Sequence, residues 1–167
     1  MKKNITNNNG FTLIEMMVTV VILSIIVLGL VTFFSGGIRS WVSGQSQLKA
    51  QREARQAMDR MVREIREADY IIDTATNDTV DFHTPFDGEI SYSYNESNKR
   101  ISRDSVELIN GVKECTFSYY DKNKSPIDPP ESDKVSIVKI NLEIDVDNDE
   151  NPDITLQSEV NLRNFGL

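Results

Sequence analysis

The stretch NNNGFTLIEMMVTVVIL, residues 7–23, decides how this sequence folds. A polar run ends at Gly10, an apolar run begins at Phe11, and one carboxylate, Glu15, lies in the fifth position of the apolar run. The apolar run continues to Phe34, which makes 24 residues. As a helix these residues would extend over about 36 Å at roughly 1.5 Å per residue, enough to cross a hydrocarbon core of about 30 Å. The sequence therefore predicts a membrane-spanning helix.

A short polar leader, MKKNITNNNG, precedes this helix. A secretory signal peptide places its apolar stretch before the cleavage site, whereas here the apolar stretch comes after the leader. Cleavage after Gly10 would therefore leave the hydrophobic helix on the mature chain. Lys2 and Lys3 favour a cytoplasmic N-terminus, with residue 39 and its successors on the other side of the membrane.

Glu15 is unusual because a carboxylate at the centre of a membrane helix costs about 2.5–3.5 kcal/mol, and less near an end. The sequence leaves two readings open. In one, Glu15 lies at the membrane interface and reaches water. In the other, it pairs with a positive charge on a neighbouring helix, and cleavage after Gly10 would create one in the α-amino group of Phe11. Coulomb attraction between two such groups is stronger in a medium of low dielectric constant.

The stretch GFTLIEMMVTVVILSIIVLGL, residues 10–30, resembles the class III signal of type IV prepilins and of the pseudopilins of type II secretion systems. The resemblance implies that a prepilin peptidase cuts after Gly10 and N-methylates Phe11. It implies that Glu15 pairs with the N-terminal amine of the adjacent subunit during filament assembly. It also implies partners: other pilin or pseudopilin subunits, a membrane assembly platform and ATP-driven motors. The resemblance places the chain in the cytoplasmic (inner) membrane, and then in an extracellular or periplasmic filament.

A second helix is predicted in LKAQREARQAMDRMVREIREADY, residues 48–70, where apolar residues recur at steps of three and four. Its apolar face comprises Ala54, Met58, Met61, Val62, Ile65, Ala68 and Ile72. The preceding stretch contains Gly36, Gly37 and Gly44, at which we expect the helix to bend or fray, because each glycine costs about 1 kcal/mol relative to alanine. The apolar face needs a partner, and the obvious one is a β-sheet downstream.

From residue 79 the hydrophobic period changes to two, which indicates strands. The predicted strands are TVDFH (79–83), EISYSY (89–94), RISRD (100–104), VKECTFSYYD (112–121), VSIVKINLEIDVD (135–147) and ITLQSEVNLRN (154–164). The prediction is an α+β fold, in which a long N-terminal hydrophobic helix continues into an amphipathic helix packed on a small antiparallel sheet. The resemblance implies the same pilin-like lollipop.

Four segments follow from these patterns. They are a leader (1–10), a transmembrane and filament-core helix (11–34), an amphipathic helix (35–72) and an antiparallel β head (73–167). The amphipathic helix and the closing VNLRN also resemble minor pilins and pseudopilins of the J or W kind. Many pilins join a C-terminal loop with a cysteine pair, and many major pilins have a proline in the membrane helix. This sequence has neither a cysteine pair nor a proline in residues 11–34, and both departures from the family pattern favour a minor component over a bulk subunit.

Charge is unevenly distributed along the chain, whose net charge is −8. Residues 39–69 contain seven Lys or Arg against five Asp or Glu, whereas residues 70–167 contain nine against twenty, a net −11. An acidic head of this kind would repel a phosphate backbone, so no direct nucleic-acid binding is expected.

The acidic stretch DVDNDENPD is a candidate calcium site. Asp145, Asp147, Asp149 and Asp153 are spaced so that their carboxylates could converge on one ion, and calcium takes six to eight oxygen ligands. The stretch lacks the glycine and the terminal bidentate glutamate of an EF-hand, and it falls where a polar turn is required in any case. A calcium site and a solvated acidic turn both fit the sequence.

Catalytic patterns are weak. The single His83 and the single Cys115 each lie in a strand-like stretch, with nothing beside them to activate a nucleophile. We expect no enzyme activity, and interpret the chain as a structural minor pilin or pseudopilin of a type IV pilus-like filament. One alternative is a pseudopilin of a type II secretion system. Another is a single-span membrane protein whose head binds a ligand and never assembles.

Overall fold

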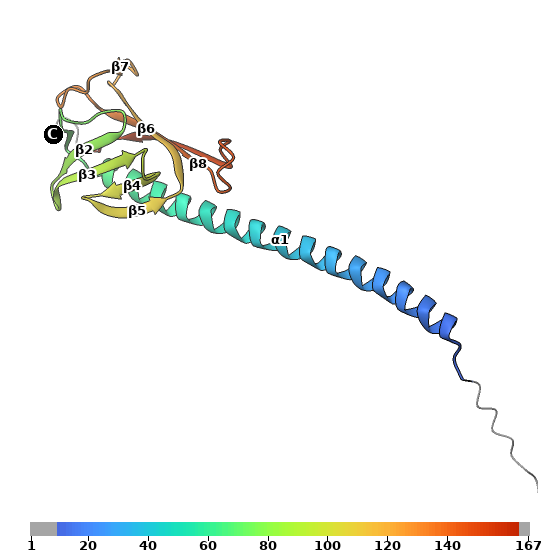
Figure 1. Cartoon of the computed structure of the whole chain (residues 1–167). Helices are drawn as coiled ribbons and strands as arrows, with labels where there is room; N and C mark the ends of the chain where they lie inside the picture. The colour runs from blue at the N-terminus through green and yellow to red at the C-terminus, as the bar shows by residue number, and fades with distance from the viewer. Residues whose placement is uncertain (1–9, 164–167) are drawn as a thin grey trace, which may run out of the picture. The chain divides into compact units, whose positions relative to one another are not determined.

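The computed structural model describes residues 10–163. The chain divides after Gly44 into two compact units, of which the second contains both β-sheets. One helix, α1 (Leu13–Arg66), supplies all the helical residues of the first unit and the helix of the second (Figure 1). In the first unit its apolar side chains are exposed, as a membrane helix without its lipid would be. Among the described residues, α1 alone is long and apolar enough to cross a membrane, with a mean hydropathy of 2.8 over its most apolar window.

The end of α1 differs from the sequence prediction, which extended the amphipathic helix to residue 72. The helix ends at Arg66, and the amides of Glu67 and Ala68 bond to carbonyls three residues back, at 3.1 Å each. Such tightened bonds satisfy carbonyls that a helix end otherwise leaves without partners. The expected disruption at the glycines is also absent, since residues 36, 37 and 44 all have helical backbone.

The first sheet is a five-stranded antiparallel meander, coloured green to yellow in Figure 1. Its strand order follows the chain, so each strand pairs with the one before it. Buried residues alternate with more exposed ones in its second strand, as expected for a sheet with one face on the core. The strands are β1 (Tyr70–Ile71), β2 (Thr79–Thr84), β3 (Gly88–Asn95), β4 (Arg100–Arg103) and β5 (Val106–Asn110).

The second sheet has four antiparallel strands in the order β7-β6-β8-β9. The register between β8 and β9 places Val138 opposite Val160 and Leu142 opposite Leu156, so apolar residues of the two strands share one face. The strands are β6 (Val112–Tyr120), β7 (Pro126–Ile127), β8 (Ile137–Ile144) and β9 (Ile154–Asn161).

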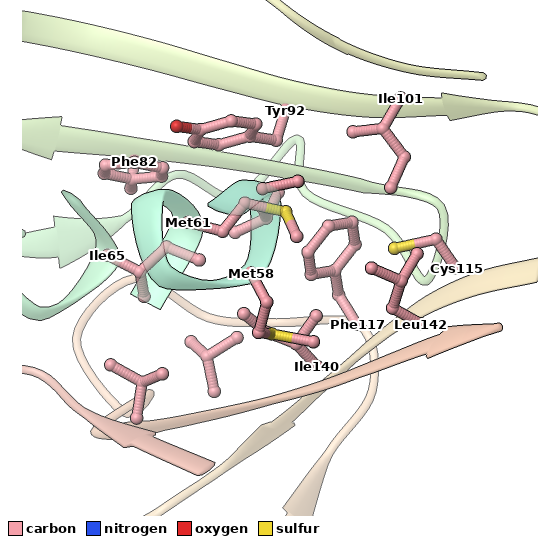
Figure 2. Close-up of a cluster of buried hydrophobic side chains, with 14 of the residues drawn as sticks. Met58, Met61, Ile65, Phe82, Tyr92, Ile101, Cys115, Phe117, Ile140 and Leu142 are labelled. Carbon is pink, nitrogen blue, oxygen red and sulfur yellow. The ribbon is translucent and has the colours of Figure 1, made fainter. Parts of the chain in front are cut away.

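The core of the second unit lies between α1 and both sheets, as Figure 2 shows. Met61 and Ile65 of the helix are fully buried. In Figure 2 they lie between Phe82 and Tyr92 of the first sheet and Ile140 of the second. A buried Met or Ile side chain contributes about 1.5–3 kcal/mol relative to an exposed one. Burial against two sheets is therefore what positions the helix in the head.

The predicted fold class, α+β with a long N-terminal helix and antiparallel strands, is confirmed. Six strands, β2, β3, β4, β6, β8 and β9, correspond to predicted ones, whereas β1, β5 and β7 were not predicted. Two sheets form where one small sheet was expected. Alternation along a chain identifies which face of a strand is buried but does not say which strands pair.

Candidate functional site

The helix start in the motif is fixed by a local cap. Thr12 precedes α1, and its hydroxyl oxygen accepts a hydrogen bond from the backbone amide of Glu15 at 3.3 Å. A threonine followed three residues later by glutamate is the pattern of a capping box. The carboxylate of Glu15 thus belongs to the first helical turn, where the positive end of the helix dipole favours a negative charge by about 0.3–1 kcal/mol.

The other polar side chains of the apolar segment bond to their own helix. The hydroxyls of Thr19, Ser24 and Thr32 donate to backbone carbonyls three or four residues earlier, at 2.7–2.9 Å. Such bonds satisfy a hydroxyl that has no water around it. Glu15 differs from them: within the described part of the chain its carboxylate has no hydrogen-bond donor and no ion-pair partner. Any protein partner for this charge would therefore come from outside the described residues.

Gly10 and Phe11 lie in the non-helical stretch directly before α1. Both are exposed, and 77% of Phe11 is accessible. A Cβ added to Gly10 would meet no atom within 4 Å, so the fold itself does not require a glycine there. The peptide bond between the two residues is therefore accessible to a peptidase, and a requirement for Gly10 would have to come from the enzyme that reads it.

The acidic turn between β8 and β9 brings together three of the four predicted aspartates. Carboxylate oxygens of Asp145, Asp147 and Asp149 lie within 4.8 Å of one another. Asp145 is 4% exposed, and its carboxylate accepts hydrogen bonds from the amides of Asn148 at 2.7 Å and Glu150 at 3.1 Å. Desolvation acts to raise the pKa of Asp145, but these amides outweigh it and hold that pKa below its usual value.

The fourth aspartate, Asp153, is directed elsewhere. Its carboxylate accepts hydrogen bonds from the amide of Val146 at 2.7 Å and from the side chain of Gln47 at 3.1 Å. Two lysines contact the same turn: Lys99 donates to the side chain of Asn148, and Lys113 to the carbonyl of Glu150. The turn is therefore held by hydrogen bonds of the chain itself, and calcium binding there stays a prediction.

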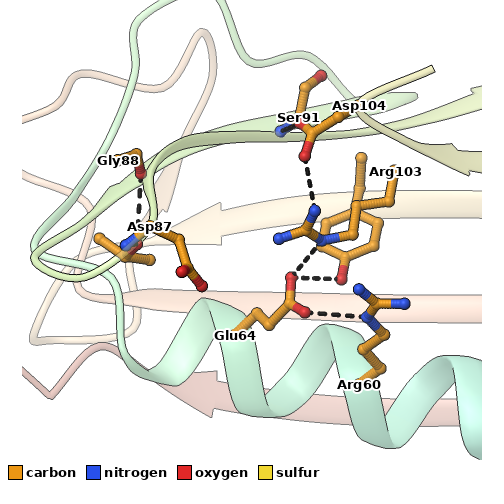
Figure 3. A network of polar contacts seen from close by, with 9 residues as sticks. Arg60, Glu64, Asp87, Gly88, Ser91, Arg103 and Asp104 are labelled. Atoms are coloured by element: carbon orange, nitrogen blue, oxygen red, sulfur yellow. Dashed lines mark hydrogen bonds and ion pairs between the residues drawn. The ribbon is translucent and has the colours of Figure 1, made fainter. Parts of the chain in front are cut away.

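A polar network that the sequence did not predict joins the helix to the first sheet (Figure 3). Glu64 accepts hydrogen bonds from Tyr92 at 2.7 Å, Arg103 at 2.8 Å and Arg60 at 2.9 Å. Arg60 and Glu64 lie at i,i+4, the spacing at which opposite charges meet on a helix, so a local pattern can suggest this contact. The other two donors come from β3 and β4, and no local pattern could have identified them. The network fixes the helix against the sheet and contacts neither the cleavage motif nor the acidic turn.

The two residues considered for catalysis lie in different surroundings. Cys115 is fully buried in the core, and desolvation raises the pKa of its thiol to about 12. His83 in β2 contacts Asp69 at 3.2 Å and stacks on Tyr70, with ring centroids 5.2 Å apart. A thiol with such a pKa is not ionised at neutral pH, so it is a poor nucleophile.

One family model matches the chain: the prokaryotic N-terminal methylation motif, over residues 5–31. Comparison with curated proteins gave no match. The matched stretch contains Gly10, Phe11 and Glu15 and the first turns of α1. This motif is the class III signal of type IV pilins and pseudopilins, and in this chain it opens an apolar helix followed by antiparallel sheets. The chain thus carries the N-terminal methylation motif of type IV pilins and pseudopilins, on an apolar helix suited to anchor it in a membrane.

Proposed function

We propose that this chain is a minor pilin or pseudopilin that is stored in the cytoplasmic membrane and then assembled into a type IV pilus-like filament. The observation that carries the proposal is the isolated charge of Glu15 in residues 11–34, which contain no other charged side chain and whose large apolar side chains are exposed. A membrane protein that never assembled would carry this charge at a cost, whereas a filament supplies its partner.

Processing is the first step of the proposed mechanism. Hydrolysis of the exposed peptide bond after Gly10 leaves a carboxylate on the leader and a new amine on Phe11. Methylation of that amine keeps its positive charge. Lys2 and Lys3 in the leader favour a cytoplasmic N-terminus, which would put the peptidase cut on the cytoplasmic side. The mature protein would then consist of the anchor segment (11–34), the remainder of the helix to Arg66 and the β head that follows it.

Assembly is the second step. In a bundle of anchor helices, the Phe11 amine of one subunit would lie beside Glu15 of the next. Coulomb attraction between the two groups offsets part of the cost of holding each charge away from water, and this attraction exists only in the assembled state. The exposed apolar side chains of the helix, among them Leu23 and Val27, would be buried in the same step. The charge pair therefore sets the register between helices, and apolar contact holds them together.

Whether the filament is a surface pilus or the pseudopilus of a type II secretion system is a finer question. The single cysteine and the absence of proline from the anchor helix favour a minor subunit in either system. Neither feature distinguishes a surface pilus from a secretion pseudopilus. We place the pilus first and the secretion pseudopilus second, because the motif is common to both.

The test is replacement of Glu15 with alanine in the native host. We expect Glu15→Ala to be processed and inserted in the membrane normally, but to be depleted from sheared filaments. The matched control is Glu53→Ala, which removes an exposed glutamate from the same helix beyond the apolar segment. Equal incorporation of Glu15→Ala and wild type would contradict the proposed role of this charge. Absence of the wild-type chain from every filament fraction would favour the non-assembling alternative.

A further inference from the structure

The helix of the second unit presents a basic face opposite to its buried face. Four arginines are exposed there, and at the α-helical rotation of 100° per residue they fall within an arc of about 80°. The buried side chains of the same helix recur on the other side. The four exposed arginines, named here the basic stripe, are Arg52, Arg55, Arg63 and Arg66. The buried side chains are Ala54, Ala57, Met58, Met61 and Ile65.

The charge of the basic stripe is poorly balanced within the chain. None of its arginines is in an ion pair among the described residues, whereas Arg60, at the edge of this face, pairs with Glu64 at 2.9 Å. Asp59 is the one acidic residue within the same arc, and it leaves the stripe net positive. Leu48, 59% exposed, also lies on this face. Arginines beside an exposed leucine on a rigid helix are typical of a protein-contact surface.

A complementary surface lies on the outer face of the first sheet. A hollow of about 420 Å³ is lined there by three carboxylates. Asp104 is paired with Arg103 at 2.7 Å, whereas Asp81 and Glu89 have no ion-pair partner among the described residues. Asp81 alternates with the buried Val80 and Phe82 in β2, so it projects away from the core. Phe86, 87% exposed, lies in the turn that leads from β2 into β3. The lining carboxylates, named here the acidic hollow, are Asp81, Glu89 and Asp104.

We propose that the basic stripe of one copy of this chain docks on the acidic hollow of a second copy. The two surfaces carry opposite charge, stand on different elements and both face away from the core, so each is open to another molecule. A contact between two different surfaces of identical subunits is heterologous, and repetition of such a contact builds an open filament instead of a closed dimer. The inference rests on the proposed function and adds the requirement that two copies lie side by side.

Charge reversal tests this contact in the full-length chain in its host. The stripe variant is Arg52→Glu with Arg55→Glu, and the hollow variant is Asp81→Lys with Glu89→Lys. Each alone should lower the fraction of the chain found in filaments by about tenfold or more, because like charges would then face each other. A chain with all four substitutions should recover the wild-type fraction. The control, Glu96→Lys with Asp133→Lys, makes the same charge change at exposed positions outside the hollow and should leave the fraction unchanged.

The outcomes separate this inference from the proposed function. If wild type assembles and the stripe variant is not rescued by the hollow reversal, the stripe contacts something else, such as anionic lipid headgroups, and the inference is wrong. If neither reversal affects incorporation, the inference is wrong while the proposed function stands. If the processed wild-type chain enters no filament at all, both fail. Leader cleavage and recovery in the membrane fraction show that each variant is processed and inserted, and urea unfolding of the purified variant shows that its head is folded.

A cross-link identifies the partner directly. With Arg55→Cys and Glu89→Cys in one chain, a short bis-maleimide should link neighbouring copies into a ladder of multiples. The buried thiol of Cys115 should not react, since it is fully covered in the core. Replacing Glu89→Cys with Glu96→Cys should abolish the ladder. Products that contain only other proteins would overturn the assignment of a second copy as the partner.

Discussion

At the scale of single residues, Glu64 contributes most to the polar contacts of the head, because its carboxylate accepts hydrogen bonds from three donors in the helix and the first sheet. Tyr92 is fully buried and the side chain of Glu64 is 13% exposed. A donor or acceptor that loses its partner in such a place costs about 1–3 kcal/mol. The same network shows why sequence alone identifies only local contacts: Arg60 and Glu64 lie one helical turn apart, whereas the other two donors lie 28 and 39 residues away along the chain.

The first prediction concerns this network. Tyr92→Phe should lower the free energy of unfolding by about 1 kcal/mol, and Glu64→Gln by about 1–3 kcal/mol, because hydrogen bonds to a charged group are the stronger ones. The measurement is urea unfolding of the full chain in detergent. Tyr70→Phe is the control, since this side chain is 41% exposed and its substitution should change the free energy of unfolding little. Equal effects of the two tyrosine substitutions would contradict the account.

The second prediction concerns pH. Desolvation acts to raise the pKa of Glu64, but the hydrogen bonds from Arg103, Arg60 and Tyr92 outweigh it and hold the pKa below its usual value. A lowered pKa in the folded state stabilises the protein above the unfolded pKa of about 4.3, and this stabilisation is lost as pH falls through the folded value. Wild type should therefore exceed Glu64→Gln in stability at pH 7, and the gap should narrow below about pH 4. A gap that is constant with pH would show that ionisation of Glu64 contributes nothing.

At the scale of elements, the helix and sheets are joined mainly by apolar burial. Met61 is fully buried, so Met61→Ala should cost about 2–5 kcal/mol, whereas exposed Gln56→Ala on the same helix should change the unfolding free energy by less than about 0.5 kcal/mol. The two variants can be compared by urea unfolding. Similar stabilities would mean that the helix does not pack in the head as described.

The acidic turn between β8 and β9 provides an element-scale prediction of its own. Desolvation and then the charges of Asp149 and Asp153 raise the pKa of Asp147, so a cation would relieve this repulsion. If the three clustered aspartates bind calcium, millimolar calcium should produce heat in a calorimetric titration and Asp149→Asn should reduce it. Absence of heat from the wild-type chain would remove the calcium interpretation and leave a turn held by its own amides and lysines.

Elements were predictable to different degrees, and the reasons are physical. Long strands such as β8 alternate clearly, and its alternating apolar residues Val138, Ile140, Leu142 and Ile144 are all buried. Two-residue strands such as β1 and β7 contain too few positions to show a period. Helix continuation through Gly36 and Gly37 was missed because the roughly 1 kcal/mol cost of each glycine is small beside that of interrupting a long helix in an apolar setting.

At the scale of the whole molecule, the N-terminal motif is identified from the sequence, whereas the acidic hollow of the head is identified only from the structure. The motif at residues 5–31 was recognisable because its meaning is local: a cleavable bond, a capped helix start and one charge in an apolar run. The acidic hollow was not recognisable, because it gathers residues from separate strands. Assembly would use both the motif and the surfaces of the head. Contacts between anchor helices would set the register of the subunits, and contacts between heads would determine which subunits lie next to one another.

The most direct test of the central claim is the mass of the mature chain. The chain is to be extracted from the membranes of its native host and measured intact, with its N-terminal peptide sequenced by fragmentation. The account predicts a polypeptide that begins at Phe11 and carries one methyl group on its terminal nitrogen, because only the freed amine can neutralise Glu15 of the next subunit. A chain that still begins at Met1 would contradict the account, since the proposed counter-charge would then never form.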